Sequence, residues 1–106
     1  MKNFNFKSIK NTKESSKVFT GNAAFLAGGM TLLPAMKLGL AAYSDIINIK
    51  SIKSLSGIKV SSKSIKIGST TTHADVASSK EVKKTIPSLS NLADGIGDPQ
   101  VRNRGT

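Results

Sequence analysis

The sequence predicts a mixed α+β fold, because short strand-like and short helix-like segments follow one another along the chain. Three observations support this prediction. An apolar segment at 23–27 stops abruptly at Gly28 and Gly29. Residues 57–68 show the period-two alternation of a hairpin, and the residues after Pro87 show the spacing of an amphipathic helix. We see no internal repeat and no low-complexity linker.

The chain opens with a predicted strand followed by a short helix. Phe4 and Phe6 alternate with polar residues over 3–8, which is the pattern of a strand. Asn11 is a suitable helix N-cap, and Glu14 follows it at the spacing of a capping box. The sequence therefore predicts a short helix that ends near residue 18, before the turn at Gly21-Asn22.

A strand, a helix and a second strand follow. Residues 23–27 are apolar without alternation, as in a strand buried on both faces. Residues 32–42 are predicted to be partly helical, with Pro34 tolerated in the first turn. The segment 45–49 is predicted to be a strand.

The next segments are 51–55, 57–61 and 64–68. In the last two, isoleucine and valine alternate with lysine around Ser61-Ser62, which predicts a hairpin with one solvated face. Thr72 is placed to cap a short helix from His73 to about Ser78.

Two further helix signals lie in the C-terminal part of the sequence. Ser78 and Glu81 have capping-box spacing. Pro87 begins a better helix, which Gly95 and Gly97 end, and Asp98-Pro99 confirms the stop. Its apolar residues lie at i, i+3, i+4 and i+7, and they are Leu89, Leu92, Ala93 and Ile96.

Composition excludes several classes of site. The 106 residues suffice for one modest domain, and they contain no cysteine and one histidine, His73. Disulfides, cysteine-ligated metals and multi-histidine metal sites are therefore excluded within this chain. No apolar run is long enough to span a bilayer, and the N-terminus has no apolar secretory segment, so we expect a cytoplasmic location.

The net charge of +10 raises the question of nucleic-acid binding. However, 14 of the 16 cations are lysines, and they are scattered from Lys2 to Lys84. Aromatic residues accompany them only at Phe4 and Phe6. We therefore interpret most lysines as a solvated surface and expect no nucleic-acid partner; an acidic partner protein fits the same charge.

Taken singly, the motifs favour structural roles. The Gly28-Gly29 pair is neither a dinucleotide fingerprint nor a P-loop, and a tight turn is its commoner meaning. Thr31 could donate to a phosphate or cap the helix behind it. His73 has no catalytic partner nearby and is interpreted as a surface residue at a helix N-terminus.

Asp75 and Asp98 are interpreted as helix-cap and turn residues. Arg102 and Arg104 could bind an anion or lie on a solvated strand.

Taken together, the segments resemble the FAD-binding subunits of molybdenum hydroxylases, above all the medium subunit of aerobic carbon monoxide dehydrogenases. The resemblance includes the loop Ala27–Leu38, the strand 46–49 and the segment Ile67–Thr71 with the helix that carries His73-Ala74-Asp75. Its most specific part is the stretch Asp98–Thr106, which in the family leads into a second pyrophosphate loop. Met30, Gly39 and Asn48 depart from residues that are frequent in the family.

This resemblance implies a PCMH-type, vanillyl-alcohol-oxidase-like FAD-binding fold. It implies that residues 1–56 form the first FAD-binding subdomain and residues 57–106 the start of the second. In the family, electrons pass from a molybdenum–pterin centre in a large subunit, through iron–sulfur clusters in a small subunit, to FAD and then to an external acceptor. The resemblance also implies cofactor contacts from nine residues: Ala27, Gly28, Gly29, Met30, Thr31, Leu32, Gly68, Ser69 and Thr106.

Two alternatives remain open at this stage: a non-catalytic truncated remnant, and a small basic nucleic-acid-binding module. The sequence carries only the first of the family's two glycine loops. We therefore expect residues 1–106 alone to bind FAD poorly and to catalyse nothing.

Overall fold

The computed structural model describes all 106 residues, and these form two compact units. The first unit is Met1–Leu55 and the second is Ser56–Thr106. Each unit has its own sheet and its own buried residues, so each is described by itself. No helix is long and apolar enough to cross a membrane.

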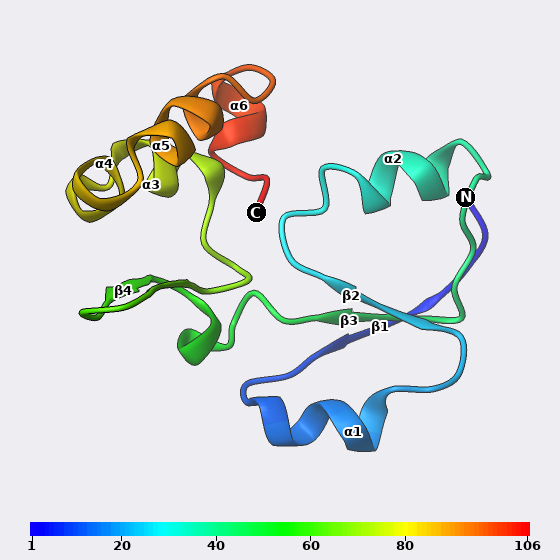
Figure 1. Cartoon of the computed structure of the whole chain (residues 1–106). Helices are drawn as coiled ribbons and strands as arrows, with labels where there is room; N and C mark the ends of the chain where they lie inside the picture. Colours follow the sequence, from blue (N-terminus) through cyan, green and yellow to red (C-terminus); the bar gives the residue numbers. More distant parts are fainter. The chain divides into compact units, whose positions relative to one another are not determined.

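The first unit is a three-stranded parallel sheet with helices on both faces (Figure 1). Its elements, in chain order, are β1 (Asn5–Ser8), the 3-10 turn η1 (Thr12–Glu14), α1 (Ser15–Val18), β2 (Ala23–Leu26), α2 (Leu32–Lys37), β3 (Asp45–Asn48) and the 3-10 turn η2 (Lys53–Leu55). The strand order is β1-β3-β2, so the last strand lies between the first two. Parallel neighbours require crossover connections, which is why helices join the strands.

The central strand β3 carries the core of this unit. Ile46 and Ile47 are almost completely buried, and their alternation sends one side chain to each face of the sheet. Ile47 packs with Ile9 and Ile52, while α2 contributes the buried Met36.

The prediction that residues 23–27 are buried on both faces is wrong. β2 is an edge strand, its burial is only partial, and β3 takes the position between two neighbours.

The second unit consists of an antiparallel hairpin and four helices (Figure 1). Its elements are β4 (Ile58–Val60), β5 (Ile65–Ile67), α3 (His73–Ser78), α4 (Lys80–Thr85), α5 (Pro87–Asp94) and α6 (Pro99–Arg102). One core cluster of Val76, Val82 and Ala93 packs against isoleucines of the hairpin. The hairpin and a helix that begins at Pro87 are thus present as predicted. The predicted apolar face is wrong in two positions: Leu92 is two-thirds exposed, and Ile96 lies beyond the end of α5 at Asp94.

Two predicted helix signals are displaced. Ser79, not Ser78, caps α4, because its hydroxyl accepts a hydrogen bond from the Val82 amide at 3.2 Å. The Ser78 hydroxyl instead donates to the Ala74 carbonyl inside α3.

Asp98-Pro99 does not only follow the end of α5; it also begins another short helix. The Asp98 carboxylate accepts from the Val101 amide at 2.8 Å and begins α6. The strand interpretation of 102–104 is therefore wrong.

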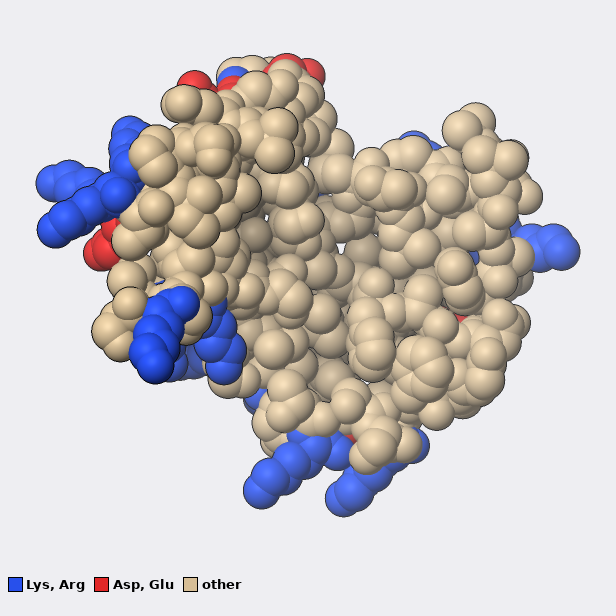
Figure 2. Space-filling view, viewed as in Figure 1, with Lys and Arg blue, Asp and Glu red and all other residues tan.

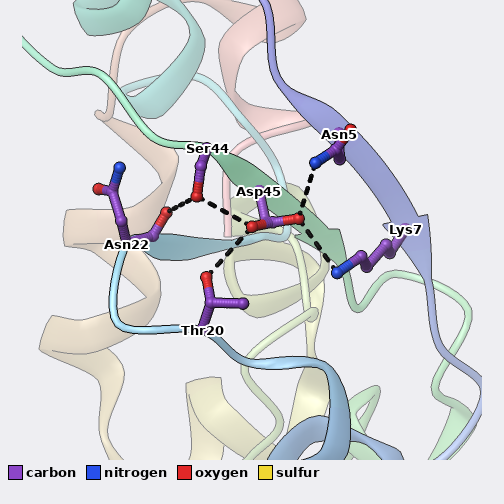
Figure 3. A network of polar contacts seen from close by, with 6 residues as sticks. All are labelled: Asn5, Lys7, Thr20, Asn22, Ser44 and Asp45. Carbon is purple, nitrogen blue, oxygen red and sulfur yellow. Dashed lines mark hydrogen bonds and ion pairs between the residues drawn. The ribbon is translucent and has the colours of Figure 1, made fainter.

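A single buried carboxylate, Asp45 at the start of β3, connects three segments of the first unit (Figure 3). From β1, the Lys7 ammonium lies 3.0 Å from Oδ1 of Asp45, and the side-chain amide of Asn5 donates to the same oxygen at 3.3 Å. From the turn before β2, the Thr20 hydroxyl donates to Oδ2 at 3.1 Å. The Ser44 hydroxyl lies 2.9 Å from both Oδ2 and the Asn22 carbonyl oxygen.

These contacts lower the pKa of the Asp45 carboxyl from 3.8 to about 2. The largest cause is the Lys7 ammonium, followed by the Ser44 hydroxyl; burial acts in the opposite direction. Because the pKa is lowered in the folded state, the ionised carboxyl stabilises the fold above its unfolded pKa of about 4. That stabilisation is lost as the pH falls from about 4 to about 2.

We expect Asp45→Asn to lower the stability of the protein at neutral pH, because the amide cannot pair with Lys7 and leaves donors without an acceptor. The variant should also lose the part of the acid dependence that falls between about pH 4 and about pH 2. Urea unfolding at several pH values measures both effects. Asp94→Asn, which changes an exposed acid without a hydrogen bond or ion pair, is the matched control. If the free energy of unfolding changed with pH in the same way in the wild type and in Asp45→Asn, the acid dependence could not be assigned to Asp45.

Candidate functional site

The first group of predicted site residues, 27–32, follows β2: residues 27–31 form the turn between β2 and α2, and Leu32 begins α2. Gly29 has φ +79°, the left-handed region that glycine adopts at little cost. The positive φ is at Gly29 and not at its neighbour Gly28, which is buried. A Cβ atom on Gly29 would lie 3.0 Å from Leu33 Cδ1 and 3.1 Å from Leu26 Cδ1. The turn is therefore closely packed on two leucines, and both φ and space favour glycine.

Successive backbone N–H groups of the turn have no acceptor within the chain. The N–H groups of residues 28–31 donate no hydrogen bond. The Gly29 carbonyl accepts from Leu33 and the Thr31 carbonyl accepts from Ala35, so these carbonyls are engaged in starting α2. Thr31 precedes α2 but makes no side-chain capping bond, so the capping interpretation of its hydroxyl is wrong. Donors without acceptors at a glycine turn suit an anionic ligand.

The charge around this turn is compatible with an anion. No acidic residue occurs between Glu14 and Asp45 in the sequence, and Asp45 is already engaged with Lys7. Figure 2 shows few charged atoms over β2 and α2 on the visible face, whereas Lys and Arg atoms project from the region of α1. An anion at residues 28–31 is thus not repelled by a neighbouring carboxylate in this stretch of sequence.

The second group of predicted site residues comes together in the second unit. Gly68, Ser69 and Thr106 line one cavity of about 240 Å³. The Gly105 carbonyl accepts a hydrogen bond from the His73 amide at 2.9 Å, which brings residues 105–106 to the start of α3. The rest of the wall is mostly apolar and is formed by Ile67, Thr71, His73, Val76, Leu89, Leu92, Ala93 and Ile96.

Sequence reasoning missed His73 and Thr71 as part of this cavity. The sequence predicts a surface position for His73, whereas the residue is half-buried and lies against Gly105. A Cβ on Gly105 would lie 3.0 Å from His73 Cδ2 and 3.1 Å from the Val101 carbonyl oxygen. Thr71 is buried, and its hydroxyl bonds to the backbone of Gly57. No local motif reveals such pairings, because their partners lie far apart in the sequence.

The two groups belong to different units, and the structure brings together the members within each group. No group of three or more His, Cys, Asp or Glu residues is placed to hold a metal ion.

Comparison with known proteins gives consistent results. Residues 2–106 match the family described as the FAD binding domain in molybdopterin dehydrogenase. The chain is 45% identical over 85 residues to the carbon monoxide dehydrogenase medium chain of Hydrogenophaga pseudoflava, covering 80% of this chain and 30% of that one. It is 33% identical over 105 residues to the glyceraldehyde dehydrogenase medium chain of Sulfolobus acidocaldarius, covering 97% and 37%.

Solved structures agree with these sequence relationships. A chain of the carbon monoxide dehydrogenase from Hydrogenophaga pseudoflava that lacks the Mo-pyranopterin moiety superposes with a TM-score of 0.92 at 39% identity, covering 97% of this chain and 37% of that one. A chain of quinoline 2-oxidoreductase from Pseudomonas putida 86 gives 0.94 at 26% identity, covering 99% and 38%. The chain therefore spans about a third of the length of these relatives.

We expect Gly29→Ala to lower the free energy of unfolding by about 1–2 kcal/mol, because alanine is strained at this φ. Two further variants separate the causes. Gly39 has φ +74° but no atom within 4 Å of a Cβ, so Gly39→Ala reports the φ cost alone. Gly21→Ala meets neither restriction and should leave stability nearly unchanged. Urea unfolding of the three variants measures the effect, and wild-type stability in Gly29→Ala would refute it.

Proposed function

The chain belongs to the family of FAD-binding domains of molybdopterin dehydrogenases, and from this we propose that it is the FAD-binding part of a carbon monoxide dehydrogenase-type medium subunit. We further propose that its two units are the first subdomain and the start of the second subdomain of a PCMH-type, vanillyl-alcohol-oxidase-like fold. The proposed partners are an iron–sulfur small subunit and a molybdopterin large subunit.

The observation that carries the proposal is the turn at residues 28–31 with its unpaired N–H groups. The pyrophosphate of FAD is doubly negative, and backbone amides in a glycine turn can hold such oxygens. Gly29 keeps the turn tight, while Met30 and Thr31 are exposed beside it. The free hydroxyl of Thr31 is a further donor. The donor set and the local lack of carboxylates fit the cofactor.

The cavity of the second unit offers a different kind of surface. Its walls are mostly apolar, and the hydroxyl-bearing residues Ser69, Thr71 and Thr106 belong to its lining. The Thr71 hydroxyl is already bonded to the Gly57 backbone. Such a combination suits a heteroaromatic ring with polar edges. We propose that Gly68, Ser69 and Thr106 contact the flavin nucleotide there.

The residues of this chain bind and orient; none is needed as an acid, base or nucleophile. Bound FAD supplies the redox chemistry, carrying electrons between the iron–sulfur clusters of the complex and an external acceptor. What the protein contributes is a fixed set of donors and an apolar cavity that excludes water from one part of the ligand.

We expect Met30→Glu to weaken FAD binding at least about tenfold, because it places a negative charge beside the proposed pyrophosphate site. Thr31→Val should weaken FAD binding less, because valine has nearly the same shape as threonine and removes only the hydroxyl donor. Neither variant should change the melting temperature much, since both side chains are exposed and Thr31 makes no capping bond. Calorimetric titration of the complete polypeptide that the gene encodes, freed of flavin, measures the affinities.

Leu38→Glu is the matched control. It adds the same charge to an exposed apolar position, 74% accessible, just beyond the other end of α2. Its affinity should stay close to that of the wild type. Equal losses in Met30→Glu and Leu38→Glu would indicate general charge repulsion and would argue against a pyrophosphate site at residues 28–31.

A further inference from the structure

The β4–β5 hairpin carries three exposed lysines and no acid. They are Lys59, Lys63 and Lys66. No acidic residue occurs from 46 to 74 in the sequence. The one ion pair of the chain joins Lys7 to Asp45 in the other unit, so the hairpin lysines have no internal counter-ion.

The strand register places two of these lysines directly opposite each other. Lys59 pairs with Lys66 in the antiparallel ladder. The bonds from Ser61 to Ser64 and from Gly68 to Gly57 mark hydrogen-bonded pairs two residues to either side, so 59 and 66 form a hydrogen-bonded pair as well. Their Cβ atoms are then about 5 Å apart. Like charges at this position oppose the pairing of the strands.

The hairpin is held so that these lysines face outward. Ile58, Ile65 and Ile67, at alternate positions, pack on the core cluster of the second unit. At the tip, the Ser61 hydroxyl lies 2.9 Å from the Ser64 hydroxyl and accepts from the Ser64 amide at 3.1 Å. Lys63 lies in this turn, which connects the two strands. Figure 2 shows Lys and Arg atoms projecting from the region of the hairpin and of α4.

We propose that the outer face of the hairpin, formed by Lys59, Lys63 and Lys66, is a docking surface for an acidic segment of a partner protein. Carboxylates placed between Lys59 and Lys66 remove the repulsion that the fold alone leaves in place, so charge complementarity supports this occupant.

Nucleic acid fits less well, since residues 44–106 contain no Phe, Tyr or Trp on which a base could stack. The three lysines also fall short of the four to eight basic residues typical of anionic lipid binding. The proposal does not depend on flavin binding.

The test is the affinity of the protein for a short fluorescent poly-glutamate peptide, measured by anisotropy at low ionic strength. Lys59→Glu should weaken binding at least about tenfold, since it brings a carboxylate against the acidic peptide. It should also raise the melting temperature, because a Glu–Lys pair replaces two opposed lysines. Lys66→Glu should act in the same way, and Lys59→Gln should give a smaller change of the same sign in both measurements.

Lys17→Glu is the matched control, because Lys17 is exposed on α1, has no ion pair and undergoes the same change of charge. It should leave peptide binding nearly unchanged. Equal weakening by Lys17→Glu would show that only the net charge of the chain attracts the peptide, and would overturn the proposal. Tighter binding to phosphatidylserine vesicles, or to a single-stranded oligonucleotide of matched charge, would overturn it in favour of a membrane or nucleic-acid partner.

Discussion

The first unit depends on one buried charge. Asp45 begins the only strand that has neighbours on both sides, and its carboxylate gathers donors from β1 and from the turn before β2. A buried carboxylate is costly unless it is paired and hydrogen-bonded, so these donors are required as a set. The same contacts fix the start of β3 relative to both neighbours. Because β2 pairs with β3 in a fixed register, the position of β3 also sets where β2 ends and the glycine turn begins.

The candidate site follows from this arrangement. A parallel strand that ends at a glycine pair leaves backbone N–H groups without partners, and the helix that follows uses the carbonyls but not these donors. In the second unit, a backbone bond between His73 and Gly105 places Thr106 beside Gly68 and Ser69. Side chains closely approach Gly29 in the first group and Gly105 next to Thr106 in the second unit. We propose that the two groups recognise an anionic, partly aromatic ligand.

Short-range sequence patterns predicted those elements whose formation depends on neighbouring residues. The period-two hairpin, the Asn11 and Thr72 caps and the helix from Pro87 follow from short-range sequence alone, and the structure contains them. The edge position of β2 could not be predicted, because an apolar run of five residues looks the same in a central strand and in a partly covered edge strand. The Asp45 network and the cavity at His73 join residues that are 25 to 40 and about 30 positions apart, respectively. For the site, the glycine turn was visible in the sequence, whereas the cavity walls required the fold.

The strand order has a consequence for folding during synthesis on the ribosome. β1 and β2 do not pair with each other, and each waits for β3, whose Asp45 lies opposite Asn5 and Ala23. Until that third strand emerges, two short strands have unpaired edges and the apolar residues between them have no sheet to cover. Pairing over such separations carries the entropy of closing long loops, which slows folding. The first unit can therefore complete its sheet only after residues 45–48 have been synthesised.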